Sequence, residues 1–188
     1  MTDRTWYPTL PLMRKMSTKS DQTSLVFCNV KNGIHRAITQ LKHIPNIESI
    51  TPVAGRFDLV IKLRTNEPEK AFNTIEKIRE IEDITATQTA FSMHQVSNSR
   101  EHETEQPIVY ALMKVKGALT EVLQRLKTFP NCVEAHVIPG EFDLVAAFRG
   151  NSPEEVLENS VTKIGSIHGI TASETLLAWN PPSSETRP

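Results

Sequence analysis

The sequence contains only two cysteines, Cys28 and Cys132, among its 188 residues. This excludes the dense disulfide framework of a small secreted domain, and we interpret both as small buried thiols. It also lacks an apolar run of about 18 residues, the length needed to cross a bilayer. Residues 1–20 contain no continuous apolar stretch like that of a secretory signal. We therefore expect a cytoplasmic protein that makes no contact with a membrane.

An excess of either charge is missing too, since 21 basic and 22 acidic residues leave a net charge of −1. Nucleic-acid binding depends on Lys and Arg at phosphates, so we predict no direct contact with DNA or RNA. The six histidines form no His-x-x-x-His or Glu-x-x-His pair, and no Cys-x-x-Cys or glycine-rich phosphate loop occurs. The sequence thus predicts neither a metal site nor a cofactor.

What the chain does contain is an internal repeat. The hexamer Gly-Arg-Phe-Asp-Leu-Val at residues 55–60 returns as Gly-Glu-Phe-Asp-Leu-Val at residues 140–145, a shift of 140 − 55 = 85. Pro45-Asn46 and Pro130-Asn131 keep the same frame. Beyond one extra residue near Val161 the shift becomes 86. Each copy is therefore one structural unit.

Hydrophobic periodicity predicts the order strand, helix, strand, strand, helix, strand in each copy. In the first copy a helical apolar stripe begins at Ile34 and ends before Pro45, and a second helix begins near Pro68. We expect Asn66 and Asn151 to cap the second helices, and Phe72 and Val161 to be buried on them. The four strands of the first copy are predicted near residues 25–30, 47–53, 57–64 and 84–89.

The third strand has two unlike faces. Phe57, Leu59, Ile61 and Leu63 form an apolar face, whereas residues 58, 60, 62 and 64 form a mixed one. We expect the apolar face to pack on the helices and the mixed face to meet the other copy. The fold class is thus α+β, with two ferredoxin-like βαββαβ repeats that form an intramolecular dimeric α+β barrel.

We divide the chain at the changes in composition. The predicted parts are a flexible leader (1–22), a first repeat (23–93), a polar linker (94–106), a second repeat (107–179) and a flexible tail (180–188).

Each copy resembles the effector-binding domain of Lrp/AsnC transcription regulators, also called the RAM domain. The resemblance is carried by residues 115–117 (Val-Lys-Gly), 126–130 (Leu-Lys-Thr-Phe-Pro), 133–135 (Val-Glu-Ala) and 140–144 (Gly-Glu-Phe-Asp-Leu). It implies a dimeric α+β barrel that binds small effectors, often amino acids, in clefts between assembled domains. Regulators of this family place a helix-turn-helix before the domain, and residues 1–22 are too short to form one.

The resemblance also implies the ligand-binding residues, which lie at the Gly-x-Phe-Asp turns. They are Gly55, Arg56, Asp58, Gly140, Glu141 and Asp143. Arg56 departs from the pattern, because an acid is usual there, so the two turns need not bind the same group. In the alternative interpretation the glycines only form turns, and the aspartates accept backbone N–H groups within those turns. Arg64 and Arg149 would then form salt bridges or cap the ends of their strands.

We therefore expect a stand-alone small-molecule sensing and oligomerisation module that acts in transcription regulation without its own DNA-binding domain. Its expected partners are an effector such as an amino acid, further copies of itself, and relatives that carry a helix-turn-helix. Two alternatives stay open. One is a small α+β barrel enzyme of the monooxygenase type, for which Asp143 and His136 are the residues to consider, and the other is a purely structural assembly module.

Overall fold

The computed structural model describes residues 21–98 and 108–179 of the chain. Most of the predicted leader, much of the predicted linker and the whole predicted tail lie outside these ranges. The first half consists of β1 (Gln22–Val30), α1 (Ile34–Leu41), β2 (Ile47–Ala54), β3 (Leu59–Thr65), α2 (Pro68–Arg79) and β4 (Ile84–Phe91). The second half consists of β6 (Ile108–Val115), α3 (Leu119–Lys127), β7 (Cys132–Val137), β8 (Leu144–Arg149), α4 (Pro153–Gly165) and β9 (Ile170–Ala178), and β5 (His94–Ser97) joins the halves.

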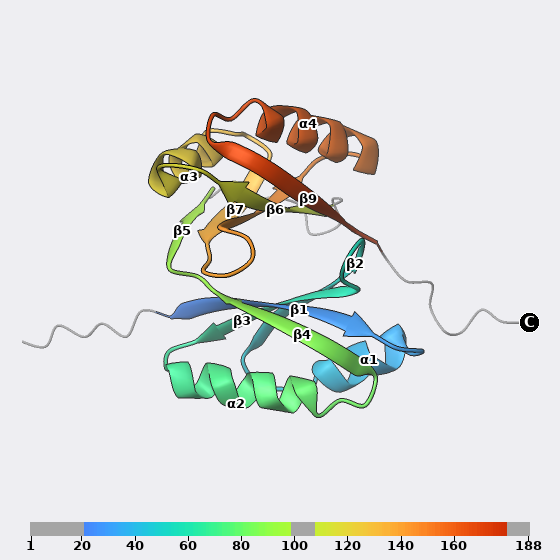
Figure 1. Ribbon diagram of the computed structural model, residues 1–188. Helices are drawn as coiled ribbons and strands as arrows, with labels where there is room; N and C mark the ends of the chain where they lie inside the picture. The colour runs from blue at the N-terminus through green and yellow to red at the C-terminus, as the bar shows by residue number, and fades with distance from the viewer. Residues whose placement is uncertain (1–20, 99–107, 180–188) are drawn as a thin grey trace, which may run out of the picture.

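The strands pair in the order β4-β1-β3-β2-β9-β6-β8-β7-β5, and all the pairs are antiparallel. Each half has the ferredoxin-like arrangement, and the halves pack sheet to sheet with their helices outside (Figure 1). The predicted α+β fold of two repeats is therefore confirmed. Within the described residues the hydrogen-bonded order is open, with β4 and β5 at its two ends.

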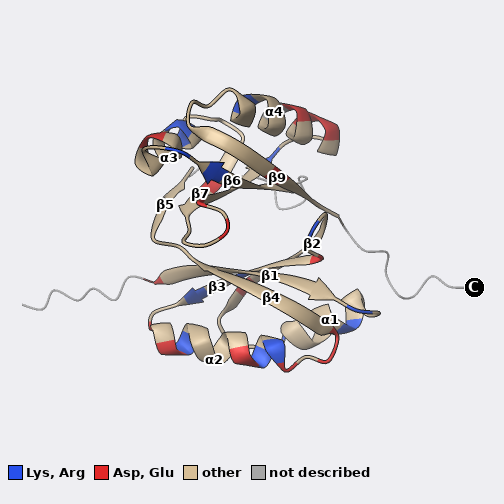
Figure 2. Cartoon of the chain, viewed as in Figure 1, with Lys and Arg blue, Asp and Glu red and all other residues tan. Residues whose placement is uncertain are grey.

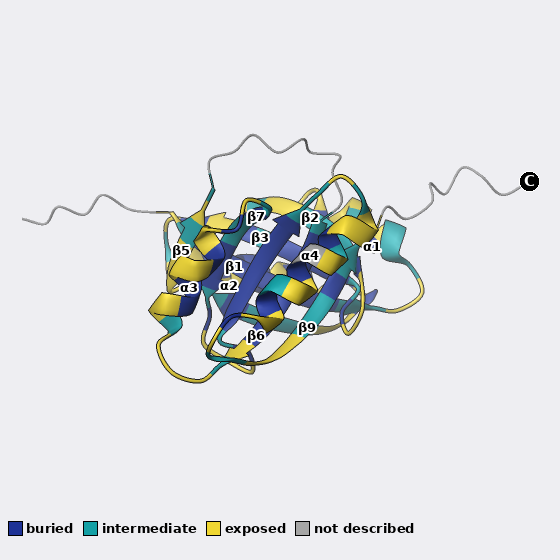
Figure 3. Cartoon of the chain, turned by 90° about the horizontal axis from the view of Figure 1, so that it is seen from above, coloured by how far each residue is buried: buried dark blue, intermediate teal, exposed yellow. Residues whose placement is uncertain are grey.

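Three apolar clusters form the core, and one of them joins the two halves. One lies beneath α1 and α2, one beneath α3 and α4, and the third between the two sheets. Leu59, Ile61 and Leu63 of β3 belong to the helix side, whereas Val60 belongs to the central cluster, as the alternation predicts. Seen from above, α3 and α4 turn exposed faces to solvent, and buried strands lie behind them (Figure 3).

Phe57 is a correction to the predicted faces. It precedes β3 rather than continuing it, and its side chain packs in the central cluster. Its ring centroid lies 5.2 Å from that of Phe27. The strand alternation therefore begins only at Leu59, because Phe57 still belongs to the turn between β2 and β3.

The predicted helix caps are wrong by one residue. The residues before Pro68 and Pro153 occupy the N-cap positions, and these are Glu67 and Ser152 rather than the asparagines. The Ser152 hydroxyl accepts a hydrogen bond from the Glu155 backbone N–H at 3.1 Å. The extra residue of the second copy lengthens the helix, since α4 has 13 residues and α2 has 12.

Phe72 and Val161 are also not buried as predicted, with 60% and 51% of their surface exposed. Each follows directly after a residue that already fills the inward stripe, Ala71 in α2 and Ser160 in α4. The buried Ser160 hydroxyl has a hydrogen-bond partner within the helix, since it donates to the Val156 carbonyl at 2.6 Å. A step of one residue turns the next side chain by about 100°, and so toward solvent.

Strand β5 lies inside the predicted linker, where no strand was expected. It pairs with β7 from His94↔Val137 to Ser97↔Glu134. Its four residues contain a single apolar side chain, Val96, so the sequence has too little alternation to reveal a strand.

Charged residues of both signs lie on the outer helices, as α2 and α4 show in Figure 2. Among residues 21–98 and 108–179, no helix is long and apolar enough to cross a membrane.

Candidate functional site

Both predicted glycines form tight turns between two strands. The φ angles of Gly55 and Gly140 are +144° and +147°, a conformation that residues with a side chain rarely adopt. Gly55 also packs closely against the other half, since a Cβ there would lie 2.7 Å from Cδ2 of Leu176. The turn role predicted for these glycines is confirmed.

Asp58 and Asp143 tie each turn to the end of the neighbouring strand. Oδ2 of Asp58 accepts the Val30 N–H, and Oδ2 of Asp143 accepts the Val115 N–H, both at 2.8 Å. The interpretation that these aspartates accept backbone N–H groups is therefore confirmed, but the donors lie on the neighbouring strand and not within the turn, as was expected. A ligand at either aspartate would share its carboxylate with this bond.

The structure brings Arg56 and Glu141 together. Nη1 and Nη2 of Arg56 donate to Oε1 and Oε2 of Glu141 at 2.6 and 2.7 Å. Oε2 of Glu174 lies 3.8 Å from the same guanidinium. The hydrogen bonds from Arg56 lower the pKa of Glu141. The Glu141 carboxylate that accepts them raises the pKa of Arg56. Two predicted ligand-binding residues thus bind each other across the two halves.

The aromatic residues of the turns surround this ion pair. The Arg56 guanidinium carbon lies 5.3 Å from the centroid of the Phe57 ring and 5.9 Å from that of Phe142. A ligand carboxylate that approached Arg56 here would have to displace the Glu141 carboxylate. The sequence could not indicate this contact, because it depends on how the halves dock.

An open cavity of about 590 Å³ lies beside Asp58. The first turn of α1 forms one wall, and Trp179, at the end of the second half, forms another. The backbone N–H of Trp179 donates to the Pro52 carbonyl at 3.1 Å, which fixes the backbone there. The residue is 39% exposed. The lining residues are Val30, Asn32, Gly33, Ile34, His35, Arg36, Asp58 and Trp179.

The α1 end of this cavity is polar. Its N-cap residue, Gly33, offers no side chain to the first N–H groups of the helix. The buried Asp83 carboxylate lies beside it, since a Cβ at Gly33 would be 3.3 Å from both carboxylate oxygens. Arg36 binds the buried Asp83 carboxylate through two hydrogen bonds, which lower the pKa of Asp83. The cavity therefore has the Asp58 carboxylate, the Arg36 guanidinium and the Trp179 indole ring on its walls.

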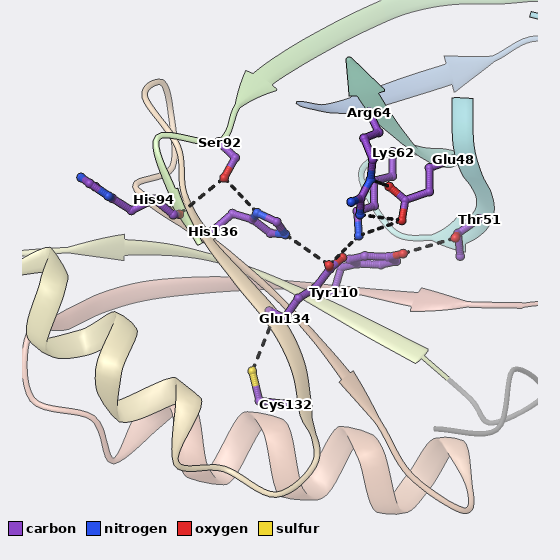
Figure 4. Close-up of polar contacts among 10 residues, drawn as sticks. All are labelled: Glu48, Thr51, Lys62, Arg64, Ser92, His94, Tyr110, Cys132, Glu134 and His136. Atoms are coloured by element: carbon purple, nitrogen blue, oxygen red, sulfur yellow. Dashed lines mark hydrogen bonds and ion pairs between the residues drawn. The ribbon is translucent and has the colours of Figure 1, made fainter. Parts of the chain in front are cut away.

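A second polar cluster lies between the sheets (Figure 4). Nζ of Lys62 donates to Oε2 of Glu134 in the other half at 2.6 Å. Nδ1 of His136 lies 3.0 Å from the Ser92 hydroxyl, and its Nε2 lies 3.5 Å from Oε2 of Glu134. Burial would raise the pKa of Glu134, but its contacts with His136 and Lys62 outweigh this and lower it to about 2. The Tyr110 hydroxyl lies 3.2 Å from Oγ1 of Thr51 nearby.

Asp143 and His136, the residues considered for an enzyme, bind different partners. Asp143 accepts the Val115 N–H, whereas His136 contacts Ser92 and Glu134. Ser92, His136 and Glu134 thus contact one another in series. The backbone N–H groups of Ser92 and Met93, however, already donate to the Thr23 and Val137 carbonyls. They are not available to stabilise an oxyanion.

Both cysteines are free and buried, and burial raises the pKa of each thiol to about 12. The interpretation of Cys28 and Cys132 as structural thiols is confirmed. The part of the chain that the structure describes holds no group of three His, Cys, Asp or Glu side chains that could bind a metal ion.

Several solved structures share the fold. Siroheme decarboxylase NirDL matches with a TM-score of 0.63 at 11% identity, over 85% of this chain and 72% of that one. A mutant chlorite dismutase from Candidatus Nitrospira defluvii matches with a TM-score of 0.58 at 9% identity, over 86% and 91% of the two chains. At such low identity these similarities establish the fold alone.

Comparisons of sequence give relatives of part of the chain and the family of the whole. The HTH-type transcriptional regulator FL11 of Pyrococcus furiosus is 34% identical over 71 residues, which are 37% of this chain and 46% of the regulator. Its counterpart in Pyrococcus horikoshii is 35% identical over the same shares. The chain thus spans about half the length of the curated relatives it matches. Residues 24–102 and 108–188 each match the Lrp/AsnC ligand binding domain, so the chain belongs to this family and carries its domain twice.

Proposed function

We propose that the chain senses a small molecule, with an amino acid as the best-fitting class, and passes the signal to transcription through its state of assembly. The observation that carries this proposal is the cavity beside Asp58, whose walls come from both halves. The family is one of ligand-binding domains, and the curated relatives are transcriptional regulators.

The chemistry of the cavity suits a zwitterion. The Asp58 carboxylate and the Trp179 indole attract an ammonium group. The Arg36 guanidinium at the first turn of α1, whose side chain is 62% exposed, attracts a carboxylate. Since Trp179 belongs to one half and Asp58 to the other, a bound ligand stabilises one arrangement of the halves over others, which a sensor requires.

The proposal is tested with the full chain and the common amino acids. Trp179 is one of only two tryptophans, so in a Trp6→Phe background its fluorescence reports the cavity directly. We expect at least one amino acid to change this fluorescence, raise Tm and change the mass measured by light scattering. No change in any of these with every amino acid would overturn the proposal.

Met93 provides a matched control, since it takes the place of Trp179 in the other repeat, 179 − 93 = 86 positions earlier. Trp179→Ala should weaken binding, measured by calorimetry, by about tenfold or more, as loss of a ring that contacts a cation predicts. Met93→Ala should leave binding unchanged. Equal loss in both variants would mean that the cavity is not the binding site.

We propose further that the chain has no catalytic activity of its own. This is supported by the engagement of Asp143 with Val115 and by the use of the Ser92 and Met93 N–H groups within the fold.

A further inference from the structure

The halves are joined at two seams, where a strand end of one half pairs with a strand of the other half. Both seams begin with the same kind of hydrogen bond. In one seam the Met93 N–H donates to the Val137 carbonyl at 2.9 Å, and in the other the Trp179 N–H donates to the Pro52 carbonyl at 3.1 Å. These bonds correspond through the repeat, because 179 − 93 = 86 and 137 − 52 = 85. In both, the chain leaving the fourth strand of one half reaches the second strand of the other half.

The seams then differ. After Met93 the chain continues as β5 and pairs with β7 over four residues. The ladder between β9 and β2 contains only Val53 and Ala54 of β2. Trp179 is followed by Asn180, Pro181 and Pro182, and proline has no N–H to donate to a ladder. Within the described residues, β2 from Ile47 to Thr51 pairs with β3 on one side and with no strand on the other.

In the second half, the corresponding edge of β7 is occupied by β5. Val96 of β5 packs against the apolar cluster beneath α3. The Asn98 side-chain amide donates to the carbonyls of Lys127, Phe129 and Cys132 at 3.2, 3.3 and 2.7 Å. Strand β5 thus covers the groove between α3 and β7 and also binds carbonyls at the end of α3.

None of residues 21–98 or 108–179 covers the matching groove of the first half. It has a volume of about 260 Å³ and lies between α1 and β2. Its apolar walls are the partly buried Ile38, Ile47 and Ile50, and Lys42 and Glu48 stand at its rim. A sheet edge beside an apolar groove is the usual site for an added peptide strand.

We propose that β2 and this groove bind an extended segment of a partner protein, which adds a tenth strand antiparallel to β2. The contacts of β5 define the segment. A β-branched apolar residue lies opposite Ile50, where Val96 lies opposite Ala135 in the second half. An asparagine two residues later lies opposite Glu48 and binds the carbonyls of Lys42, Ile44 and Ile47.

Two other occupants fit less well. The tail of this chain offers Pro181 and Pro182 where β5 has Gln95 and Val96. The β5 strand of a second copy already pairs in its own seam, so its transfer would break as many ladder bonds as it made. This proposal is independent of the sensing proposed above.

The test uses a fluorescent peptide of residues 91–98, which contains the β5 sequence, and the full chain. We expect saturable binding, and hydrogen exchange that slows at residues 47–51 but not along β4. A peptide with proline in place of Val96 should bind about tenfold more weakly or worse, since it lacks the ladder N–H. No binding of the β5 peptide, or slowed exchange elsewhere, would overturn the proposal.

Two variants of the full chain complete the test. Ile38→Glu in the groove should abolish peptide binding, and Phe72→Glu on the exposed face of α2 should not. Folding of both is checked by Tm. A chain that ends at Trp179 should bind the peptide as the full chain does. Binding only by the shortened chain would make the tail the occupant, and a dimer that Ile38→Glu dissociates would make a second copy the occupant; either result would refute a partner strand.

Discussion

Arg56 and Glu141 occupy the same position in the two repeats and bind each other through two hydrogen bonds of 2.6 and 2.7 Å. Two identical repeats with an acid at this position would place like charges together. The substitution of arginine in one copy turns repulsion into attraction, and so favours pairing of unlike halves over pairing of like halves. The departure from the family pattern that suggested a second ligand specificity therefore has a structural explanation.

Reversal of the charge at this contact tests that explanation. Arg56→Glu places a carboxylate beside Glu141 and Glu174, so we expect a lower Tm at low salt and a smaller decrease at high salt. The double variant Arg56→Glu, Glu141→Arg restores opposite charges and should regain most of the loss. Thermal unfolding at two salt concentrations measures both effects.

Arg79 is a suitable control, because it forms an exposed ion pair with Glu76 within α2, at 3.1 Å. Arg79→Glu should change Tm less than Arg56→Glu does. A double variant no more stable than Arg56→Glu would show that the contact between the turns is not electrostatic.

The repeat and its strand alternation were sufficient to predict the fold. Leu59, Ile61 and Leu63 face the helices because period-two alternation leaves little choice once one face is wholly apolar. Phe72 could not be placed in the same way, because Ala71 and Phe72 are both apolar and only one of them can face inward. Strand β5 escaped prediction because its bonds to β7, rather than its own composition, make it a strand.

The candidate site was less predictable than the fold. Its turns were evident from the sequence, but Trp179 reaches the cavity beside Asp58 only because the halves exchange strand ends. Lys62 and Glu134 likewise lie at unrelated positions of the two copies and meet at the same interface. Contacts of this kind follow from docking geometry, which a single sequence does not encode locally.

The carboxylate of Glu134 predicts an acid limit to stability. Its pKa is lowered from 4.5 to about 2 in the folded chain. Because the folded pKa lies below the ordinary value, the contribution is complete above about pH 4.5 and is lost as the pH falls toward 2. A shift of this size corresponds to a contribution on the order of 3 kcal/mol.

The measurement is urea unfolding of the parent chain and of Glu134→Gln from pH 7 to pH 2. The difference in the free energy of unfolding should be largest above pH 4.5 and shrink below it. Glu76→Gln, a change on the exposed face of α2, should give a small difference throughout. A difference for Glu134→Gln that stays constant with pH would contradict the assignment.

The two turn glycines should respond differently to the same substitution. Both have a positive φ that disfavours alanine, so Gly55→Ala and Gly140→Ala share the cost of backbone strain. A methyl group at Gly55 would lie 2.7 Å from the buried Leu176 side chain, whereas at Gly140 no atom lies within 4 Å. We therefore expect Gly55→Ala to lower the free energy of unfolding by roughly 1–2 kcal/mol more than Gly140→Ala, since it also forces the central cluster to repack. Urea unfolding at neutral pH gives both values, and equal losses would mean that Leu176 moves aside without cost.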